Sequence, residues 1–335
     1  MSAKDPSLGT SARAGVPAAR APAPGWALAQ RLELRMLALA IVLAVVLSLL
    51  SPFFLTRANV FNMLDQSVVI GIVSVGMTFV ILTGGIDLSV GSVAGFAGIV
   101  LGLSLHHMSI PLGIAATVAT GAGIGLLSGL LVNVFGLAAF VVTLGVMAIG
   151  RSLAYILSGQ QSIGDIPDGL QSIVYTDLAG IPSNVLCLLV LYGLAWAYLT
   201  FTKGGRTIYA VGSNREAARA AGLNTLLYSV LPYVLSGALA ALAATFSVGQ
   251  LLSADPLMGN ALELDAIAAV VIGGASLAGG RGSVVGTLIG VFIMVMIRNG
   301  LNLMGVSPFW QGTAIGTIII VALLGERLLS RRAER

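Results

Sequence analysis

Charged residues are scarce in this chain of 335 residues. Asp, Glu, Lys and Arg together make up 9% of the sequence, whereas hydrophobic residues make up 57% and the mean hydropathy is +1.00. Soluble domains carry about 25% charged residues, and so few charges could not cover the surface of a soluble protein of this length. The composition therefore predicts a polytopic membrane protein of the all-α class.

Cysteine, histidine and lysine are also rare. Cys187 is alone, which excludes an intrachain disulfide. His106 and His107 are adjacent in one short predicted loop with no third ligand nearby, so we predict no metal site. Neither of the two lysines, Lys4 and Lys203, lies in the G-x-x-x-x-G-K-[ST] pattern of a phosphate-binding loop. We therefore predict that the chain has no ATPase activity and no cofactor of its own.

Glycine, in contrast, is abundant, with 43 residues, which is typical of closely packed membrane helices. GxxxG spacings predict such packing, within the subunit or across a dimer, at Gly91/Gly95, Gly98/Gly102, Gly125/Gly129 and Gly282/Gly286/Gly290. Apolar runs of spanning length predict about ten transmembrane helices, at roughly 36–54, 67–83, 88–105, 109–133, 137–158, 184–202, 227–248, 263–278, 284–301 and 309–325.

The basic residues give these spans an orientation. If the N-terminus is inside, fourteen of the 17 Lys and Arg residues fall in cytoplasmic segments, whereas the outside loop 159–183 has three aspartates and no Lys or Arg. Positive residues concentrate on the cytoplasmic side, so we predict that both termini are cytoplasmic. The net charge of +4 then follows from topology and does not indicate a nucleic-acid partner. The cytoplasmic set is Lys4, Arg13, Arg20, Arg31, Arg35, Lys203, Arg206, Arg215, Arg219, Arg281, Arg327, Arg331, Arg332 and Arg335.

The chain divides into three parts by composition. Residues 1–32 are rich in Ala, Pro, Gly and Ser, and we predict a disordered cytoplasmic tail. No small-x-small cleavage site follows the first apolar run, so this run is kept as a span. Residues 33–326 form the predicted transmembrane domain, with a cytoplasmic loop at 203–226, and residues 327–335 form a basic cytoplasmic tail.

The polar stretch Lys203–Asn224 stands out between two of the apolar runs. Ser213 and Glu216 have the spacing of a capping box, several alanines follow, and Gly222 provides a stop. The pattern predicts a short helix over 214–221. Such a helix is marginal alone in water, so we expect it to rest on another surface.

Two surfaces are open to this helix. One is the inner leaflet, with Arg215 and Arg219 facing lipid phosphate, but the helix has no Leu, Phe or Trp to reach the acyl chains. The other is a groove in a partner protein, which the small alanine surface would fit. We favour the partner, because a chain without an ATPase and with few intramembrane proton carriers needs another subunit to drive uphill transport.

Two Gly-rich breaks interrupt the apolar runs, at residues 80–95 (VILTGGIDLSVGSVAG) and 270–286 (VVIGGASLAGGRGSVVG). Broken helices at membrane depth line cavities or are covered by protein, and they often mark binding or gating regions in transporters. Asp87 either takes part in such a region or caps the helix that begins at Leu88 or Ser89. The candidate residues of a translocation pathway are Gly84, Gly85, Asp87, Ser89, Gly273, Gly274 and Ser276.

Four other charged residues lie within or near predicted spans. Arg151 and Arg298 either extend to a membrane interface or pair with a carboxylate that lines a pathway. Glu263 and Asp265 either complement the dipole of a helix that begins there or act at the outer mouth, including contact with an outside partner.

Four motifs carry a resemblance to a known family. They are GMTFVILTGGIDLSVGS (76–92), GRTIYAVGSNREAARAAGLN (205–224), ELDAIAAVVIGGASLAGGRGSVVGTLIG (263–290) and NGLNLMGVSPFWQ (299–311). From about residue 33 to residue 326, the chain resembles the membrane permease subunit of ribose-type ATP-binding-cassette (ABC) importers.

The resemblance implies the ABC importer permease fold in a bacterial inner membrane. Besides membrane lipid, the implied partners are a second copy of the chain, a periplasmic sugar-binding protein, and a cytoplasmic ATPase, often with two fused nucleotide-binding domains. ATP and Mg²⁺ would bind to that ATPase. The implied substrate is a monosaccharide or related polyol, such as ribose, xylose or galactose.

The family's cytoplasmic loop maps onto the polar stretch, and the helix pattern extends the set. We predict that the ATPase-coupling residues are Gly205, Arg206, Tyr209, Ala210, Gly212, Ser213, Asn214, Glu216, Ala217, Ala218, Ala221 and Gly222. Three alternatives stay open: a related ATP-driven importer of branched-chain amino acids or nucleosides, an ion-coupled secondary carrier, and a membrane enzyme acting on lipid-linked substrates.

Overall fold

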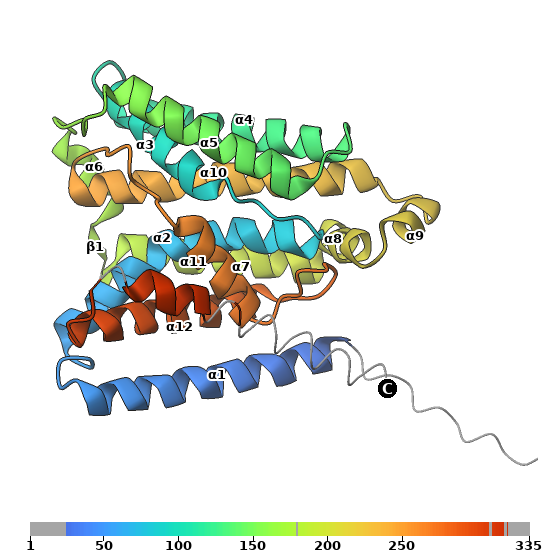
Figure 1. Ribbon diagram of the computed structural model, residues 1–335, viewed down its shortest axis with the longest axis horizontal. Coiled ribbons are helices and arrows are strands. Elements are labelled where there is room, and N and C mark those ends of the chain that lie inside the picture. Colours follow the sequence, from blue (N-terminus) through green and yellow to red (C-terminus); the bar gives the residue numbers. More distant parts are fainter. Residues whose placement is uncertain (1–24, 179, 308–309, 318–319, 321–335) are drawn as a thin grey trace, which may run out of the picture.

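The computed structural model is a bundle of long helices that run side by side (Figure 1). It describes residues 25–178, 180–307, 310–317 and 320. Within these residues, 7 helices are long and apolar enough to cross a membrane. They are α1 (Gly25–Leu50), α2 (Arg57–Leu82), α4 (Ile110–Asn133), α5 (Ala139–Ser158), α7 (Ser183–Phe201), α10 (Thr225–Leu251) and α12 (Val284–Leu303).

Two further apolar helices are too short to span alone, because a spanning helix takes about 20 residues. They are α3 (Val90–Leu105) and α11 (Leu262–Ile272), and a non-helical segment precedes each one, at 83–89 and 252–261. Of the last predicted span, 309–325, the structure describes residues 310–317 and 320, which are helical. The predicted count of ten spans is therefore not confirmed, although the multi-pass all-helical architecture is.

Two predicted boundaries near the N-terminus are wrong. The described part of α1 already includes Gly25, so residues 25–32, predicted as the end of a disordered tail, are helical. α2 begins at Arg57 rather than at residue 67, because Thr56 accepts a hydrogen bond from the N–H of Asn59 and starts the helix through a polar first turn that hydropathy does not reveal. The predicted tail segments 1–24 and 327–335 lie outside the described residues.

Short elements gather at the two ends of the bundle (Figure 1). At one end are α6 (Asp168–Val174) and an antiparallel pair of two-residue strands, β1 (Asp177–Leu178) and β2 (Ile181–Pro182). At the opposite end are α8 (Lys203–Ser213) and α9 (Arg215–Ala220). The strands depart from the all-α prediction only within the loop expected at 159–183.

α10 lies at the centre and packs against α4, α2 and α3. Glycines bring α4 and α10 together: a Cβ at Gly121 would collide with the carbonyl oxygen of Gly237, and a Cβ at Gly125 would collide with that of Tyr233. The GxxxG spacing that begins at Gly125 therefore serves close packing within the subunit, as one of the two alternatives proposed.

Candidate functional site

α8 is an amphipathic helix that the sequence interpretation missed. Thr202 begins it, because its Oγ1 accepts a hydrogen bond from the N–H of Gly205 at 3.0 Å. One face of α8 is buried against α7, α10 and α2. Much of the predicted coupling loop is thus packed into the protein rather than free in solution.

The end of α8 lies against both Gly-rich breaks. The N–H of Gly280 donates to the carbonyl oxygen of Leu82 at 2.9 Å, which joins the second break to the end of α2. A Cβ at Gly212 would collide with this same oxygen. Gly279, with φ +86°, approaches so closely that its Cβ would lie 2.8 Å from the nitrogen of Gly84. Residues without side chains allow these three backbone segments to meet.

Tyr209 provides a side-chain link in the same place. Its hydroxyl donates to the carbonyl oxygen of Gly282 at 3.0 Å. Burial, together with the nearby carboxylate of Glu33, raises the pKa of Tyr209 to about 12, so the hydroxyl keeps its proton at physiological pH. Glu33 in turn accepts a hydrogen bond from the hydroxyl of Ser283, which caps α12. The second break is therefore tied to α8 and to α1.

α9 follows α8 and projects from the bundle (Figure 1). Asn214 caps it, since its Oδ1 accepts a hydrogen bond from the N–H of Ala217 at 2.9 Å. The predicted capping box of Ser213 and Glu216 is therefore wrong. Ser213 is the last residue of α8, so it cannot also begin α9.

The C-terminal end of α9 is as the sequence predicts. Gly222 has φ +77°, and its N–H donates to the carbonyl of Arg219 at 3.0 Å, while the N–H of Leu223 donates to that of Ala218 at 3.1 Å. This pair of bonds is a Schellman motif. Ala218 is the buried residue of α9, whereas the helix exposes Arg215, Glu216, Ala217, Arg219 and Ala220.

Asp87 is buried in the first break, at 2% exposure. Its Oδ1 accepts from the backbone N–H of Ser89 at 3.0 Å and from the Ser89 hydroxyl at 2.6 Å. Its Oδ2 accepts from the hydroxyl of Ser236 on α10 at 2.8 Å. α3 begins at Val90 with Ser89 as its N-cap, so Asp87 is not the cap that was predicted for a helix beginning at Leu88 or Ser89. Asp87 instead forms a turn with Ser89 just before α3 and fastens the break to the central helix.

The other predicted pathway residues make backbone contacts in this structure. Gly84 and Gly274 have positive φ angles of +78° and +90°. Gly273 packs on Gly286 of α12, and the N–H of Ser276 donates to the carbonyl of Arg281 at 2.9 Å. A further member, Gly85, lies against the hydroxyl of Tyr233. Their role in a pathway stays a prediction.

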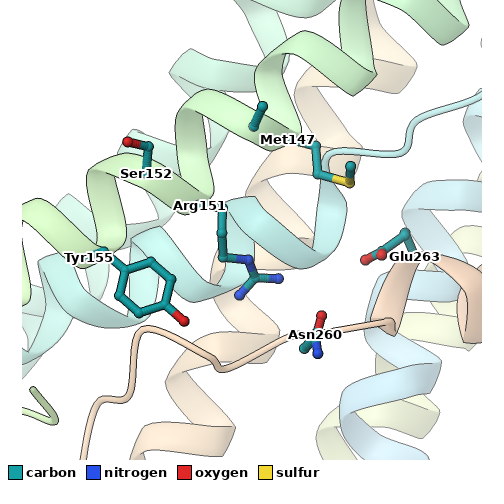
Figure 2. Close-up of a pocket in the computed structure, with 7 residues that line it drawn as sticks. Met147, Arg151, Ser152, Tyr155, Asn260 and Glu263 are labelled. Atoms are coloured by element: carbon teal, nitrogen blue, oxygen red, sulfur yellow. The ribbon is translucent and has the colours of Figure 1, made fainter. Parts of the chain in front are cut away.

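A pocket of about 460 Å³ lies beside α5 (Figure 2). The Arg151 guanidinium reaches from α5 toward the chain that leads into α11, and its Nη1 donates to the carbonyl oxygens of Pro256 and Met258, each at 3.0 Å. These backbone acceptors were not among the partners considered for Arg151. The residues that line the pocket are Met147, Ala148, Arg151, Ser152, Tyr155, Asn260 and Glu263.

Asp265 and Arg298 form an ion pair, with 2.6 Å between Oδ1 and Nη2. Arg298 therefore pairs with a carboxylate, and whether this carboxylate lines a pathway stays a prediction. Asp265 and Glu263 both lie in the first turn of α11, where a negative charge complements the helix dipole. The predicted helix start at these two acids is thus confirmed, while a role at the outer mouth stays a prediction.

These features define the class of the protein as a multi-pass membrane protein with broken helices. A family model described as "Branched-chain amino acid transport system / permease component" matches residues 59–323. The chain belongs to this permease family, and the resemblance drawn from the four motifs is confirmed.

Several of the relatives are named for sugars. Ribose import permease protein RbsC of Escherichia coli (strain K12) is 39% identical over 301 residues, which cover 88% of this chain and 93% of that protein. RbsC of Bacillus subtilis (strain 168) is 40% identical over 289 residues, 85% of this chain and 90% of that protein. D-allose transport system permease protein AlsC of Escherichia coli (strain K12) is 34% identical over 296 residues, which cover 88% of this chain and 90% of that protein.

One solved structure, an ABC transporter of the metal-chelate type in an inward-facing conformation, covers 92% of this chain and 99% of its own. Its TM-score of 0.44 and sequence identity of 16% are too low to define the fold.

Proposed function

We propose that this chain is the membrane-spanning subunit of an ATP-driven importer that carries a monosaccharide or related polyol into the cytoplasm. The observation that carries the proposal is the 39% identity to a ribose import permease over nearly the whole length of both chains. The similarity to a D-allose permease supports the same substrate class.

The proposed partners are a cytoplasmic ATPase, often one chain with two fused nucleotide-binding domains, a periplasmic sugar-binding protein and a second copy of this chain. ATP and Mg²⁺ bind to the ATPase. Both termini of the permease face the cytoplasm of a bacterial cell. The charge distribution supports this orientation, because α8 and α9 carry Lys203, Arg206, Arg215 and Arg219, while the loop at the opposite end carries acidic residues.

The predicted coupling residues divide into two groups by exposure. The exposed group contacts the ATPase, and it consists of Arg206, Ser213, Asn214, Glu216, Ala217, Ala221 and Gly222. The buried or partly buried group passes the movement inward, and it consists of Gly205, Tyr209, Ala210, Gly212 and Ala218.

The contacts of α8 give this division a mechanical meaning. A force on α9 reaches α8 directly, because one residue, Asn214, separates the two helices. α8 touches the end of α2 and the second break, so both Gly-rich breaks move with it. ATP binding then closes the ATPase dimer and draws the two α9 helices together, which rocks the permease from inward-facing to outward-facing. The loaded binding protein releases sugar into the cavity, and ATP hydrolysis resets the cycle.

Reconstitution in proteoliposomes tests the function. The permease, with the ATPase that co-purifies with it and its binding protein, is supplied with labelled D-ribose, D-xylose, D-allose or D-galactose. We expect at least one of these sugars to accumulate with ATP. Uptake that follows a proton or sodium gradient without ATPase would support a secondary carrier instead. Uptake of leucine or adenosine, and of no sugar or polyol, would support the amino-acid or nucleoside alternative.

A further inference from the structure

We propose that the pocket between α5 and the start of α11 binds the hydroxyl groups of the sugar in transit. This inference rests on the proposed function, since it assigns the sugar-contacting residues within the same permease. None of the predicted pathway residues lines this pocket.

The α5 wall offers hydrogen-bond donors beside an apolar surface. Arg151 is held in place by two backbone carbonyls that its Nη1 contacts. A guanidinium has five N–H groups in a fixed fork, so the groups on Nε and Nη2 stay available to a ligand. Figure 2 shows the guanidinium between Tyr155 and the chain that carries Asn260 and Glu263. The ring of Tyr155 provides a flat face against which the C–H groups of a sugar pack.

The opposite wall offers acceptors. Glu263 Oε2 is buried and has no hydrogen-bond partner among the described residues. This oxygen packs against Gly91 of α3 and is closed to a ligand. Glu263 is nevertheless among the residues that line the pocket, and we assign the acceptor role to the rest of its carboxylate. Asn260 is exposed at the rim, and its amide both donates and accepts.

The two walls together match a neutral polyol. Adjacent sugar hydroxyls donate and accept hydrogen bonds, so they can bridge the donors of Arg151 and the acceptor of Glu263. The charges of these two side chains balance, which leaves no net charge to attract an ion. The pocket volume of about 460 Å³ lies within the range of about 300–1,000 Å³ typical of small-molecule sites.

Two glycines of α3 lie in close contact with the residues around the pocket. A Cβ at Gly91 would collide with the Glu263 carboxylate and with the carbonyl oxygen of Gly259. A Cβ at Gly95 would lie 2.7 Å from the Met258 carbonyl oxygen and 3.3 Å from Arg151 Nη1. The shortened helices α3 and α11 thus meet at this pocket, and interrupted helices are where transporters commonly place substrate sites.

Cysteine protection in the full importer tests the site. The background is Cys187→Ser, the reporter is Ser152→Cys on the pocket wall, and the control is Gln161→Cys in the exposed loop after α5. The assembled complex is treated with a methanethiosulfonate reagent in rising concentrations of the aldose that it imports. We expect the sugar to slow modification at position 152 severalfold and to leave position 161 unchanged. In the Glu263→Gln variant, the same protection of position 152 should require a severalfold higher sugar concentration.

Three results would overturn the inference while leaving the proposed function intact: import without protection at 152, equal protection at 161, or protection that Glu263→Gln does not change. If the Glu263 variant does not assemble, Asn260→Ala replaces it, because Asn260 is exposed and contributes little to the core. A complex that imports no sugar or polyol would overturn the proposed function and this inference together.

Discussion

The backbone nitrogen of Gly280 lies 2.9 Å from the carbonyl oxygen of Leu82 and donates a hydrogen bond to it. This bond joins two segments that are far apart in sequence, the break after α2 and the break after α11. Gly212 at the end of α8 lies against the same carbonyl. One backbone oxygen is therefore the meeting point of both breaks and of the helix that leads to α9.

Gly212→Ala should disturb this meeting point. The new Cβ would collide with the Leu82 oxygen, and since the neighbours are backbone atoms, we expect a loss of about 1–3 kcal/mol in stability, together with reduced ATP-driven uptake. Thermal unfolding in detergent and uptake assays measure the two effects. Gly193→Ala on α7 is the matched control, because nothing lies within 4 Å of its Cβ position. Equal stability of the two variants would contradict this packing.

Tyr209→Phe should remove the hydrogen bond to the Gly282 carbonyl, at a cost of about 1–2 kcal/mol. The cost should also depend on pH. The pKa of Tyr209 is raised from 10.0 to about 12, so its stabilising contribution is complete below pH 10 and is lost as the pH rises toward 12. Denaturation of both proteins between pH 7 and pH 11 measures the difference. A difference that grows above pH 10 would argue against this bond.

Asp265 and Arg298 should behave as a coupled pair. Asp265 is buried, with 5% of its side chain exposed, whereas Arg298 is 30% exposed. Asp265→Asn or Arg298→Met alone leaves one group without its partner, and we expect each to cost about 3 kcal/mol. The double variant should lose clearly less stability than the sum of the losses in the two single variants. A double-mutant cycle in detergent measures the coupling, and strictly additive losses would show that the pair contributes nothing.

Asn214→Ala and Ser213→Ala separate the observed cap of α9 from the predicted one. Asn214 accepts the N–H of Ala217, so its loss should destabilise α9 by about 1 kcal/mol. Ser213 ends α8 and makes no cap to α9, so its replacement should have little effect. Hydrogen exchange at the amides of α9 distinguishes the two. Faster exchange in Ser213→Ala than in Asn214→Ala would show that Ser213, and not Asn214, caps α9.

The membrane class, the permease family and the polar loop could be predicted from the sequence, because composition, charge distribution and long motifs carry them. The end of α9 was also predictable, because Gly222 takes a left-handed conformation that glycine adopts without strain. The start of α9 was not, since Ser213 and Asn214 are both good caps. Only the extent of α8 decides between them.

The candidate site was less accessible to prediction, because it depends on contacts between distant segments. The unpartnered Glu263 oxygen and the carbonyls that hold Arg151 appear only when α3, α5 and α11 come together. The GxxxG spacing of Gly91 and Gly95 predicted close packing, but it did not indicate which segment packs against these glycines. The charges of Arg151 and Glu263, within or near apolar runs, were the local signs of this pocket.

The central claim is that α9 transmits the work of a separate ATPase to this permease. Stimulation of ATP hydrolysis by the sugar-loaded binding protein tests it most directly, in membranes that hold the wild-type complex, Glu216→Arg on exposed α9, or the control Gln161→Arg at the opposite end of the bundle. We expect Glu216→Arg to abolish the stimulation and Gln161→Arg to retain it. Wild-type stimulation in Glu216→Arg, and also after deletion of residues 214–221, would contradict the account.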